Sequence, residues 1–521
     1  MEYNIPSDIV KDLNFGDSAK NKIIAGVTKL TQAVKSTLGA SGKCVIYEDG
    51  RGKPVITKDG VTVAESVVLY DPVENMGATL IKEAARNTVK EAGDGTTTAT
   101  VLAEALIKGI NEEQQNNISV RDIKDGVYSG LDKVNNYLDK IKIEVKDDML
   151  DNVAAISCNN DKELGAIIAD AYKKVGSDGV VLMESSETDE TYVELVDGVQ
   201  LECGITSPHF ITDTEKQRAI LENPLILVVA SEIPNIRKIQ NILEFVIKNN
   251  KSLLIVAPVS QQVKSALLMN KVKGNIKVNI IDPPGFGPTK QDTIKDLAIL
   301  TNATVINEEL GDDLDGISLD ILGEAEKVVT DDKNTVITLE NIDENVKERI
   351  KEVKKLYKAE KNSFLKKYLQ QRIAMLSGSV GIVRVGANSK VELKEKRDRV
   401  EDAIYATKAA LKEGIVPGGG IALLNASQKI KPSNIGEKIL FKAIAAPFTT
   451  IMENAGLPIN VNIVEGTGTN VVTGEIVNMI ESGIIDPVLV TKTALKNSIS
   501  VVITIISADC VISNIRINEG S

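Results

Sequence analysis

Residues 91–109 read EAGDGTTTATVLAEALIKG, in which an acid between two glycines and three threonines precede an amphipathic run. From Thr98 onward apolar residues recur at spacings of three and four, which predicts a helix with one buried face. The first turn of such a helix leaves unpaired N–H groups at the positive end of its macrodipole. We therefore expect an anion, phosphate above all, to bind at the start of this helix.

The loop before the helix suits a nucleotide bound together with Mg²⁺. Gly93 and Gly95 permit a tight turn close to a ligand, and the three threonine hydroxyls can reach phosphate oxygens. Asp94 would repel phosphate unless a hard cation such as Mg²⁺ lies between them. The alternative is that Asp94 and the threonines only cap the helix. The Gly-x4-Gly-Lys-Ser/Thr pattern of a P-loop is absent.

The length and the charge of the chain limit the classes of protein to which it can belong. A chain of 521 residues predicts three or four domains at roughly 150 residues each. The chain has 61 basic and 73 acidic side chains, a net charge of −12, and no basic run stands out. This balance argues against nucleic acid as a partner.

No segment predicts a membrane partner or secretion. The apolar stretch 498–513 is interrupted by Asp509 and falls short of the roughly 20 residues that span a bilayer. The first sixteen residues have neither a basic region nor an apolar core typical of a secretory signal. We expect a soluble, cytoplasmic protein.

The cysteines and the single histidine exclude several kinds of site. The four cysteines lie far apart without a C-x-x-C pair, so we expect reduced thiols rather than zinc ligands or disulfides. His209 is the only histidine, and an incidental surface residue is its simplest interpretation. Acid–base chemistry is therefore expected from carboxylates.

The hydrophobic period changes along the chain. Residues 17–140 predict mainly helices, interrupted by a hairpin around 44–60. In the middle, short apolar runs at 223–230, 252–259 and 276–282 alternate with helical patterns at 236–248 and 260–272, which predicts a β-α-β-α-β layer. Beyond it we expect a solvated, charged helical pair at 342–376 and a helical, glycine-broken end from 400 to 521. The fold class is mainly α with an α/β middle, one domain being interrupted by another.

A second glycine loop and two more acids could belong to the same site. Gly418 to Gly420 precede a short helix, although a plain turn is the alternative. Asp59 follows a β-like run, and Asp402 is expected near the start of a helix that leads toward the glycines. The alternative for both acids is an ordinary helix cap.

Taken together, these residues resemble the group I chaperonins, the GroEL family, from about Phe15 to Val511. The matching segments are TLGASGKCVI, ITKDGVTVA, ENMGATLIKEAA, AGDGTTTATVLAEA, PGFG, VEDAIYATKAALKEGIVPGGG and MIESGIIDPVLVTK. The resemblance implies a three-domain chaperonin fold. Its parts are a helical equatorial domain at 1–139 and 413–521, a small α/β intermediate domain at 140–197 and 381–412, and an α/β apical domain at 198–380.

The resemblance also implies an ATP site with Mg²⁺ and possible K⁺. Asp94 is implied as the metal ligand, Asp402 as the residue that activates water, and Asp59 as its catalytic neighbour. The remaining implied cofactor contacts are Thr37, Leu38, Gly39, Lys58, Gly93, Gly95, Thr96, Thr97, Thr98, Gly419, Asn470, Val471, Ile484 and Asp486.

The implied function is ATP-dependent folding of non-native polypeptides. The family forms seven-membered rings, in one or two layers, and uses a co-chaperonin lid. ATP binding is expected to swing the apical domain about glycines near Gly198 and Gly378. The alternative is a ring scaffold that binds one dedicated partner without hydrolysing ATP.

Periodicity gives an independent view of the apical surface. At 100° per residue, Val263, Ala266 and Leu267 share one face of the helix within 259–272, and Leu268 and Met269 lie roughly opposite. An exposed apolar pair is typical of a binding surface. The resemblance implies a client groove at Ile205, His209, Phe210, Gln240, Leu243, Lys264, Leu268 and Met269. The family usually has apolar residues where this chain has His209, Gln240 and Lys264.

Other departures concern assembly. A family Arg/Glu pair between neighbouring subunits falls at Cys203 and Lys390, so this ion pair cannot form. A second pair used between rings is also missing, because Thr449 takes the basic position and the acidic one is deleted near Leu457. Ala40 replaces the usual proline. The number of rings stays open.

Overall fold

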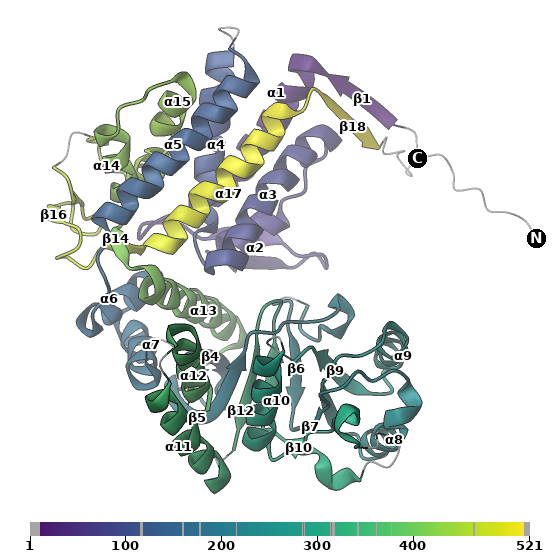
Figure 1. Ribbon diagram of the computed structural model, residues 1–521. Helices are drawn as coiled ribbons and strands as arrows, with labels where there is room; N and C mark the ends of the chain where they lie inside the picture. The colour runs from purple at the N-terminus through teal and green to yellow at the C-terminus, as the bar shows by residue number, and fades with distance from the viewer. Residues whose placement is uncertain are drawn as a thin grey trace, which may run out of the picture. The chain divides into compact units, whose positions relative to one another are not determined.

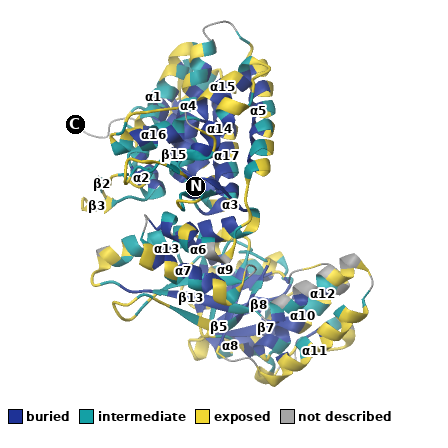
Figure 2. Ribbon diagram, turned by 90° about the vertical axis from the view of Figure 1, so that its left-hand side faces the viewer, coloured by how far each residue is buried: buried dark blue, intermediate teal, exposed yellow. Residues whose placement is uncertain are grey.

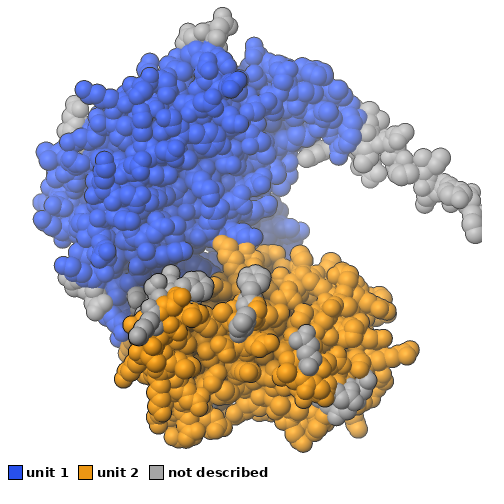
Figure 3. Space-filling model, in the orientation of Figure 1, with its two compact units in different colours: residues 1–173, 183–192, 384–521 blue, residues 174–182, 193–383 orange. Residues whose placement is uncertain are grey.

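The structure is a computed structural model. It describes residues 11–114, 118–158, 161–176, 179–214, 216–283, 285, 287–312, 314, 318–340, 343–360, 362–376, 378–461 and 464–514. Two residues of the PGFG motif, 284 and 286, lie outside this described part. The chain forms two compact units: unit 1 comprises 1–173, 183–192 and 384–521, and unit 2 comprises 174–182 and 193–383 (Figure 3).

Long helices from both ends of the sequence build the core of unit 1. They are α1 (Gly16–Lys35), α3 (Pro72–Ala92), α4 (Thr96–Gln114), α5 (Val120–Ile141) and α17 (Val488–Ser507). Figure 1 shows α17, from the C-terminal part, lying among the N-terminal helices. Each helix contributes its apolar stripe to one buried cluster that includes Leu30, Ile81, Leu106, Val134 and Ile499. The prediction that the helical ends of the chain meet is confirmed.

Helix α17 is long and apolar enough to cross a membrane, the one such helix in the described residues. However, 72 % of its most apolar window is buried within the protein. The apolar stretch at 498–513 therefore supplies the second half of this helix and continues into β18, and the helix belongs to a packed core.

Shorter helices complete unit 1. They are α2 (Gly60–Ser66), α6 (Asp147–Ser157), α7 (Lys162–Val175, its last two residues in unit 2), α13 (Lys390–Glu413), α14 (Ile421–Lys429), α15 (Ile435–Ala443) and α16 (Ala446–Ala455). Tyr172 on α7 donates to the carbonyl of Ile404 on α13 at 2.8 Å and is fully buried against it. Helices from the predicted intermediate segments therefore pack on one another within unit 1.

Short antiparallel strand pairs also belong to unit 1. They are β1 (Lys11–Phe15) with β18 (Cys510–Asn514), β2 (Val45–Glu48) with β3 (Pro54–Thr57), β14 (Ile415–Pro417) with β17 (Ile485–Pro487), and β15 (Thr467–Thr469) with β16 (Ile476–Asn478). The β2–β3 hairpin was predicted. The strands after residue 400 were not predicted, and for β14 to β17 the reason is that runs of three residues are too short to show a period of two.

Unit 2 contains the predicted β-α-β-α-β layer. Strands β7 (Pro224–Val228), β8 (Ser252–Val256) and β9 (Lys277–Ile281) run parallel, and β10 (Gly323–Glu324) joins β7 in the order β10-β7-β8-β9. Helices α8 (Gln240–Lys248) and α9 (Gln261–Val272) pack on the face of Leu253 and Ile255, whereas α10 (Pro288–Thr301) packs on the face of Leu254 and Val256. Both faces are covered, which explains the continuous apolar runs.

A second sheet in this region has the order β4-β13-β5-β12-β11-β6. Its strands are β4 (Val180–Ser185), β5 (Tyr192–Leu201), β6 (Ala219–Glu222), β11 (Lys327–Thr330), β12 (Thr335–Leu339) and β13 (Ser379–Val385). Gly198 lies opposite Thr338 within this sheet, and a Cβ there would be 2.7 Å from the carbonyl oxygen of Ile337. Gly198 is thus packed in a paired strand, and the hinge motion expected near Gly198 and Gly378 stays a prediction.

The charged helical pair at 342–376 forms α11 (Glu344–Ala359) and α12 (Ser363–Leu376). Most of α11 is exposed, as predicted (Figure 2). On α12, however, Arg372 is only 4 % exposed and donates to both oxygens of the fully buried Asp296, at 2.6 and 3.0 Å. The solvated-face interpretation is therefore wrong for Arg372, which forms a buried ion pair with α10.

The division into three domains stays a prediction. The predicted apical segment, 198–380, lies entirely within unit 2, and both predicted equatorial segments lie within unit 1. The chain passes between units at 173/174, 182/183, 192/193 and 383/384, so the predicted intermediate segments are divided between the two.

Candidate nucleotide site

A cavity of about 720 Å³ lies within unit 1, between segments that are far apart in the sequence. It is lined by sixteen of the seventeen residues assigned above to catalysis or to cofactor and metal binding: Thr37, Leu38, Gly39, Lys58, Asp59, Asp94, Gly95, Thr96, Thr97, Thr98, Asp402, Gly419, Asn470, Val471, Ile484 and Asp486. The remaining residue, Gly93, does not line it. The structure therefore brings together the two glycine loops, the three acids and the C-terminal segment of the prediction.

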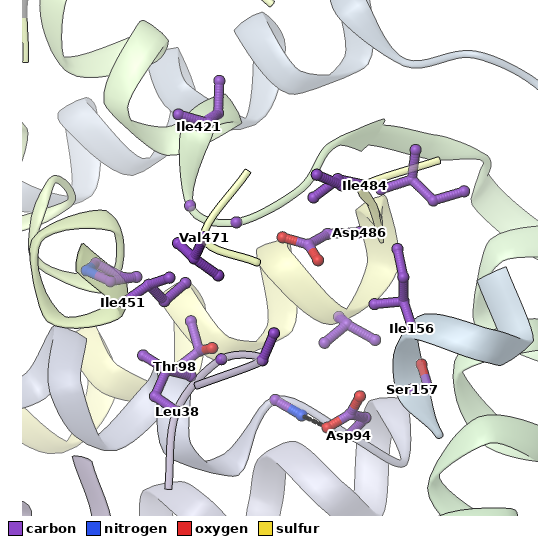
Figure 4. A pocket seen from close by; sticks show the side chains of 18 of the residues that line it. Leu38, Asp94, Thr98, Ile156, Ser157, Ile421, Ile451, Val471, Ile484 and Asp486 are labelled. Carbon is purple, nitrogen blue, oxygen red and sulfur yellow. Dashed lines mark hydrogen bonds between the residues drawn. The ribbon is translucent and has the colours of Figure 1, made fainter. Parts of the chain in front are cut away.

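The start of α4 faces this cavity with its free amides. The first helical hydrogen bond runs from the amide of Ala99 to the carbonyl of Gly95, at 2.9 Å, so the amides of residues 96–98 precede the ladder. Asp94 accepts from the amide of Gly95 at 2.5 Å (Figure 4). The Gly95 amide is therefore already engaged by Asp94, but the amides of the first helical turn stay open to an anion.

Gly93 supports the loop from behind. It ends α3 with a left-handed backbone, φ 78°, and a Cβ there would lie 2.1 Å from the Cβ of Tyr405 on α13. Only glycine can adopt this turn against that side chain without strain. Its role is thus to let the loop approach α13 rather than to contact a ligand.

Asp59 is both a helix cap and a lining residue. Its carboxylate accepts from the amides of Val61 and Thr62, at 3.1 and 2.8 Å, and from the Thr62 hydroxyl at 2.6 Å. The capping alternative is therefore correct for Asp59, and it holds the carboxylate at the cavity wall. Behind it, a Cβ on Gly60 would lie only 2.3 Å from Oγ1 of Thr97, so α2 packs directly on the phosphate-loop threonines.

Asp402 lies in the middle of α13, which begins at Lys390. The prediction that it lies near a helix start is wrong, because the polar run before it, KVELKEKRDR, is itself helical. Asp402 consequently has no capping role. Asp402 lines the cavity from the middle of the helix.

The carboxylates in the cavity wall repel one another. Loss of water, together with the charges of Asp94 and Asp59, raises the pKa of Asp402 well above its ordinary value. Burial and the charge of Asp59 likewise raise the pKa of Asp94, against the opposing effect of the Gly95 amide. A bound cation would relieve this repulsion.

Asp486 ties the second glycine loop to the same cavity. Strand β17 pairs Asp486 with Val416 of β14, and its carboxylate accepts from the amides of Gly419 and Gly420. Burial and the charge of Asp94 nevertheless raise its pKa to about 7. Figure 4 shows its carboxylate pointing into the space between the two glycine loops.

These donors fit Mg²⁺ held jointly by the protein and a phosphate group. Among the described residues, no three His, Cys, Asp or Glu side chains are grouped so that they could hold a metal ion alone. Mg²⁺ typically takes only one or two carboxylates and completes its shell with phosphates and water. The carboxylates in this cavity can provide the protein ligands of the ion, and the open helix N-terminus beside them can hold the phosphate that completes its shell.

The turn that follows α1, which lines the cavity, is held in place by hydrogen bonds from α16. Asn454 donates to the carbonyls of Lys35 and Leu38, at 2.8 and 2.9 Å, which holds the turn after α1. Thr37 lies 3.4 Å from the Thr97 hydroxyl, so this turn meets the phosphate loop. On the same wall, burial lowers the pKa of Lys58, and the nearby charge of Arg399 lowers it further.

One end of the cavity is apolar, and most of this end was missed by the prediction. In addition to Val471 and Ile484, it is lined by Ile421, Phe448, Ile451, Met452 and Met479. Several of them also form a small buried cluster, so in the sequence they look like ordinary core residues. Their position suits the flat apolar face of a nucleobase. No pattern in the sequence distinguishes them.

The predicted client-binding residues lie in unit 2, and their exposure differs. Phe210 is fully buried and Leu243 is 8 % exposed, because both pack in the core between the sheet and helices α8 and α9. In this arrangement neither side chain offers contact surface. Val263 and Leu267 are buried as predicted, but Leu268 is only half-buried rather than exposed. Among the predicted apolar contacts, Met269 is the clearly exposed one, at 63 %. Ile205 is half-buried, and His209 is exposed.

Cys203, one of the positions that departs from the family, faces inward. Its thiol lies 3.8 Å from the hydroxyl of Thr335, and burial raises its pKa to about 11. The Cys203 side chain is therefore neutral and engaged within its own subunit. Lys390 lies exposed at the first position of α13.

Comparisons with known proteins identify the family and the fold of this chain. A family model described as the TCP-1/cpn60 chaperonin family matches residues 30–516. Chaperonin gp146 from the bacteriophage EL 2 (Pseudomonas aeruginosa), solved in the presence of ATP-BeFx in crystal form II, is 22 % identical with a TM-score of 0.69. The match covers 96 % of this chain and 98 % of that one. Crystal form I of the same protein gives 22 % identity and a TM-score of 0.63, with 97 % and 99 % coverage.

Proposed function

This chain belongs to the TCP-1/cpn60 chaperonin family, and from this membership we propose that it is an ATP-hydrolysing chaperonin. In this proposal it assembles into rings, captures non-native polypeptides on unit 2, and releases or encloses them in a cycle driven by Mg-ATP. A seven-membered ring and a lid protein are the arrangements that the family resemblance favours.

One observation carries the proposal. A single cavity is lined by an open helix N-terminus, three threonines and several carboxylates, and also by a group of apolar side chains. This combination suits a nucleotide, whose base has flat apolar faces and whose phosphates are charged. The ATP-BeFx used for crystals of gp146 supports nucleotide binding by this fold.

Phosphoryl transfer requires positioned charge rather than a covalent nucleophile. The amides of the first α4 turn and the hydroxyls of Thr96 to Thr98 bind and orient the phosphate oxygens. Asp94 holds Mg²⁺, which when bound neutralises phosphate charge. Asp402 accepts the proton of the attacking water, and its raised pKa brings it nearer to the working pH of a general base.

Replacing Asp402 tests this assignment. In Asp402→Ala, we expect ATP binding to persist and steady-state ATP turnover to fall by at least about a hundredfold, because the proton acceptor is lost. Glu392→Ala is the control, since Glu392 is an exposed acid on the same helix that does not line the cavity. Wild-type turnover in Asp402→Ala would remove the proposed role.

Refolding of a denatured client enzyme tests the function as a whole. We expect the recovered activity to depend on ATP with the wild-type protein and to be largely lost with Asp402→Ala. A ring scaffold that binds one partner is the competing function, favoured by the polar residues Gln240 and Lys264 on the apical helices. That scaffold predicts an assembled protein with no ATP turnover and no effect on refolding.

A further inference from the structure

Helices α8 and α9 present a basic surface on unit 2. The inference drawn from it names the kind of client segment that this surface recognises, and it rests on the proposed function. We define the α8–α9 surface as the exposed side chains of residues 240–251 and 261–277. Both helices cover the same face of the four-stranded sheet, because the inward residues of β8 and both helices share one buried cluster. They are neighbouring elements of a single layer (Figure 1).

The charge of this layer is opposite to that of the chain. Residues 236–277 contain eight Lys and Arg side chains and one acid, Glu244, whereas the whole chain carries −12. The basic residue Lys238 forms an ion pair with Glu308 at 3.4 Å. Lys248, Lys251 and Lys273 are exposed, and none of them has a carboxylate partner among the described residues. Three exposed lysines of this layer therefore carry charge that no ion pair within the described residues neutralises.

These lysines converge because of the sheet register. Strands β8 and β9 are parallel, with Ser252 opposite Lys277, so their first residues lie side by side. Helix α8 ends at Lys248 and α9 at Val272, and each is joined to its following strand by a short connection. The lysines at both helix ends must therefore gather at the edge where the two strands begin.

Apolar side chains are exposed among these charges. Ile247 on α8 is 48 % exposed, and Met269 and Val272 on α9 are 63 % and 73 % exposed. These side chains lie in the last turns of the two helices, where the lysines also gather. An apolar patch bordered by one sign of charge is typical of a surface that binds a partner of opposite charge.

Two further lysines are fixed in position on α9. Lys264 donates to the carbonyl of Thr206, and Lys271 donates to the carbonyls of His209 and Ile211, at 3.0 and 3.3 Å. The Lys271 ammonium also lies 5.8 Å from the centre of the Phe210 ring. These bonds fasten the 206–211 segment to α9 and add positive charge that does not move away from the surface.

A simpler explanation covers only part of this pattern. Lysines near the C-terminus of a helix stabilise its macrodipole, which accounts for Lys248 and Lys271. It does not account for Lys251, which follows α8 by three residues, or for the exposed apolar residues beside it.

We propose that the α8–α9 surface selects acidic, partly apolar polypeptide segments, in which Asp or Glu alternates with large apolar residues. The apolar side chains of the client contact Ile247, Met269 and Val272, and its carboxylates lie against the surrounding lysines. The charge sets which segments bind and how fast they arrive, and the apolar contacts hold them.

Two fluorescent peptides test the proposal with the full-length, assembled protein. They share the same apolar residues and differ only in carrying Glu or Lys at the polar positions. At low salt we expect the Glu peptide to bind about tenfold more tightly by fluorescence anisotropy, and the difference to vanish near 0.5 M salt as the charges are screened. Equal affinities at low salt would overturn the proposal.

Matched variants localise the effect. In K248Q/K251Q/K273Q, we expect the Glu peptide to lose most of its advantage while ATP turnover is unchanged. The control is K351Q/K354Q/K355Q, which removes three exposed lysines from α11 of the same unit and should leave the advantage intact. An equal loss in both variants would overturn the assignment to this surface.

A denatured protein of near-zero net charge separates this inference from the proposed function. If it binds and is released by ATP but the Glu peptide has no advantage, the charge selection is wrong and the chaperonin function stands. If neither the peptides nor the denatured protein binds, the capture of clients by this chain is itself contradicted.

Discussion

At the scale of single residues, the site owes its chemistry to carboxylates that the fold forces together. Asp486 is the clearest case, because burial and the charge of Asp94 raise its pKa to about 7 despite two amide donors. An ionised Asp486 therefore destabilises the nucleotide-free protein. This cost is absent below the unfolded pKa, near 4, and is complete once the pH has risen through about 7.

The pH dependence of stability checks this shift. We expect Asp486→Asn to raise the melting temperature of the nucleotide-free protein at pH 8, where the wild-type carboxylate is ionised. The advantage should shrink as the pH falls below 7 and be nearly gone at pH 4. A stability difference that does not change between pH 8 and pH 4 would contradict the raised pKa.

Gly60 gives a second prediction at this scale. In Gly60→Ala the new Cβ would lie 2.3 Å from Oγ1 of Thr97 and 3.0 Å from Oγ1 of Thr96, so these hydroxyls must shift. We expect the affinity for ATP to fall about tenfold with the fold intact, measured by equilibrium titration. The control is Gly50→Ala, because nothing lies within 4 Å of a Cβ at that position. Unchanged affinity would show that the threonines do not position phosphate.

At the scale of elements, local patterns pointed to the site without deciding between its alternatives. The Asp94 loop and the glycines before α14 fitted an anion site but also an ordinary cap and a plain turn, and the family resemblance assigned both to the nucleotide site. The apolar end of the site was missed because Phe448, Met452 and Met479 differ in no way from core residues until the chain is folded. Asp402 was misplaced along its helix because a run of charges hides a helix that is buried on one side only.

Helices α5 and α15 offer a prediction about stability. Glu437 on α15 is 1 % exposed and accepts from Lys133 on α5, the Ser129 hydroxyl and the Ser433 amide. Burial favours its neutral form, but these donors outweigh it and lower its pKa to about 2. We expect Glu437→Gln to cost about 1–2 kcal/mol at pH 7, measured by urea unfolding at fixed protein concentration.

The sign of the pH effect is opposite to that of Asp486. The contribution of Glu437 is complete above its unfolded pKa, near 4.5, and is lost as the pH falls toward 2. The exposed Lys442–Glu112 pair joins α15 to α4, and Glu112→Gln should change stability by less than about 0.5 kcal/mol. If Glu437→Gln and Glu112→Gln lowered the free energy of unfolding equally, the claim that the buried ion pair stabilises more than the exposed one would be contradicted.

At the scale of the whole molecule, the order of elements along the chain was enough to predict how distant segments meet. Helices from both ends had to share a core because the middle has a different hydrophobic period, and α17 lies among α3, α4 and α5 as that reasoning requires. The sequence could not give the division into two compact units at 192/193 and 383/384. Those positions lie in or beside strands whose pairing depends on residues more than a hundred positions away.

The central claim is that these converging segments bind ATP through a divalent ion held by Asp94. The most direct measurement is calorimetric titration of the assembled protein with ATP, in Mg²⁺ and in excess EDTA, for wild type and Asp94→Ala. The account predicts tight binding by wild type that weakens at least about tenfold without Mg²⁺, and an Asp94→Ala protein that has lost most of this difference. An assembled wild-type protein that does not bind ATP, or binds it equally well without Mg²⁺, would contradict the account.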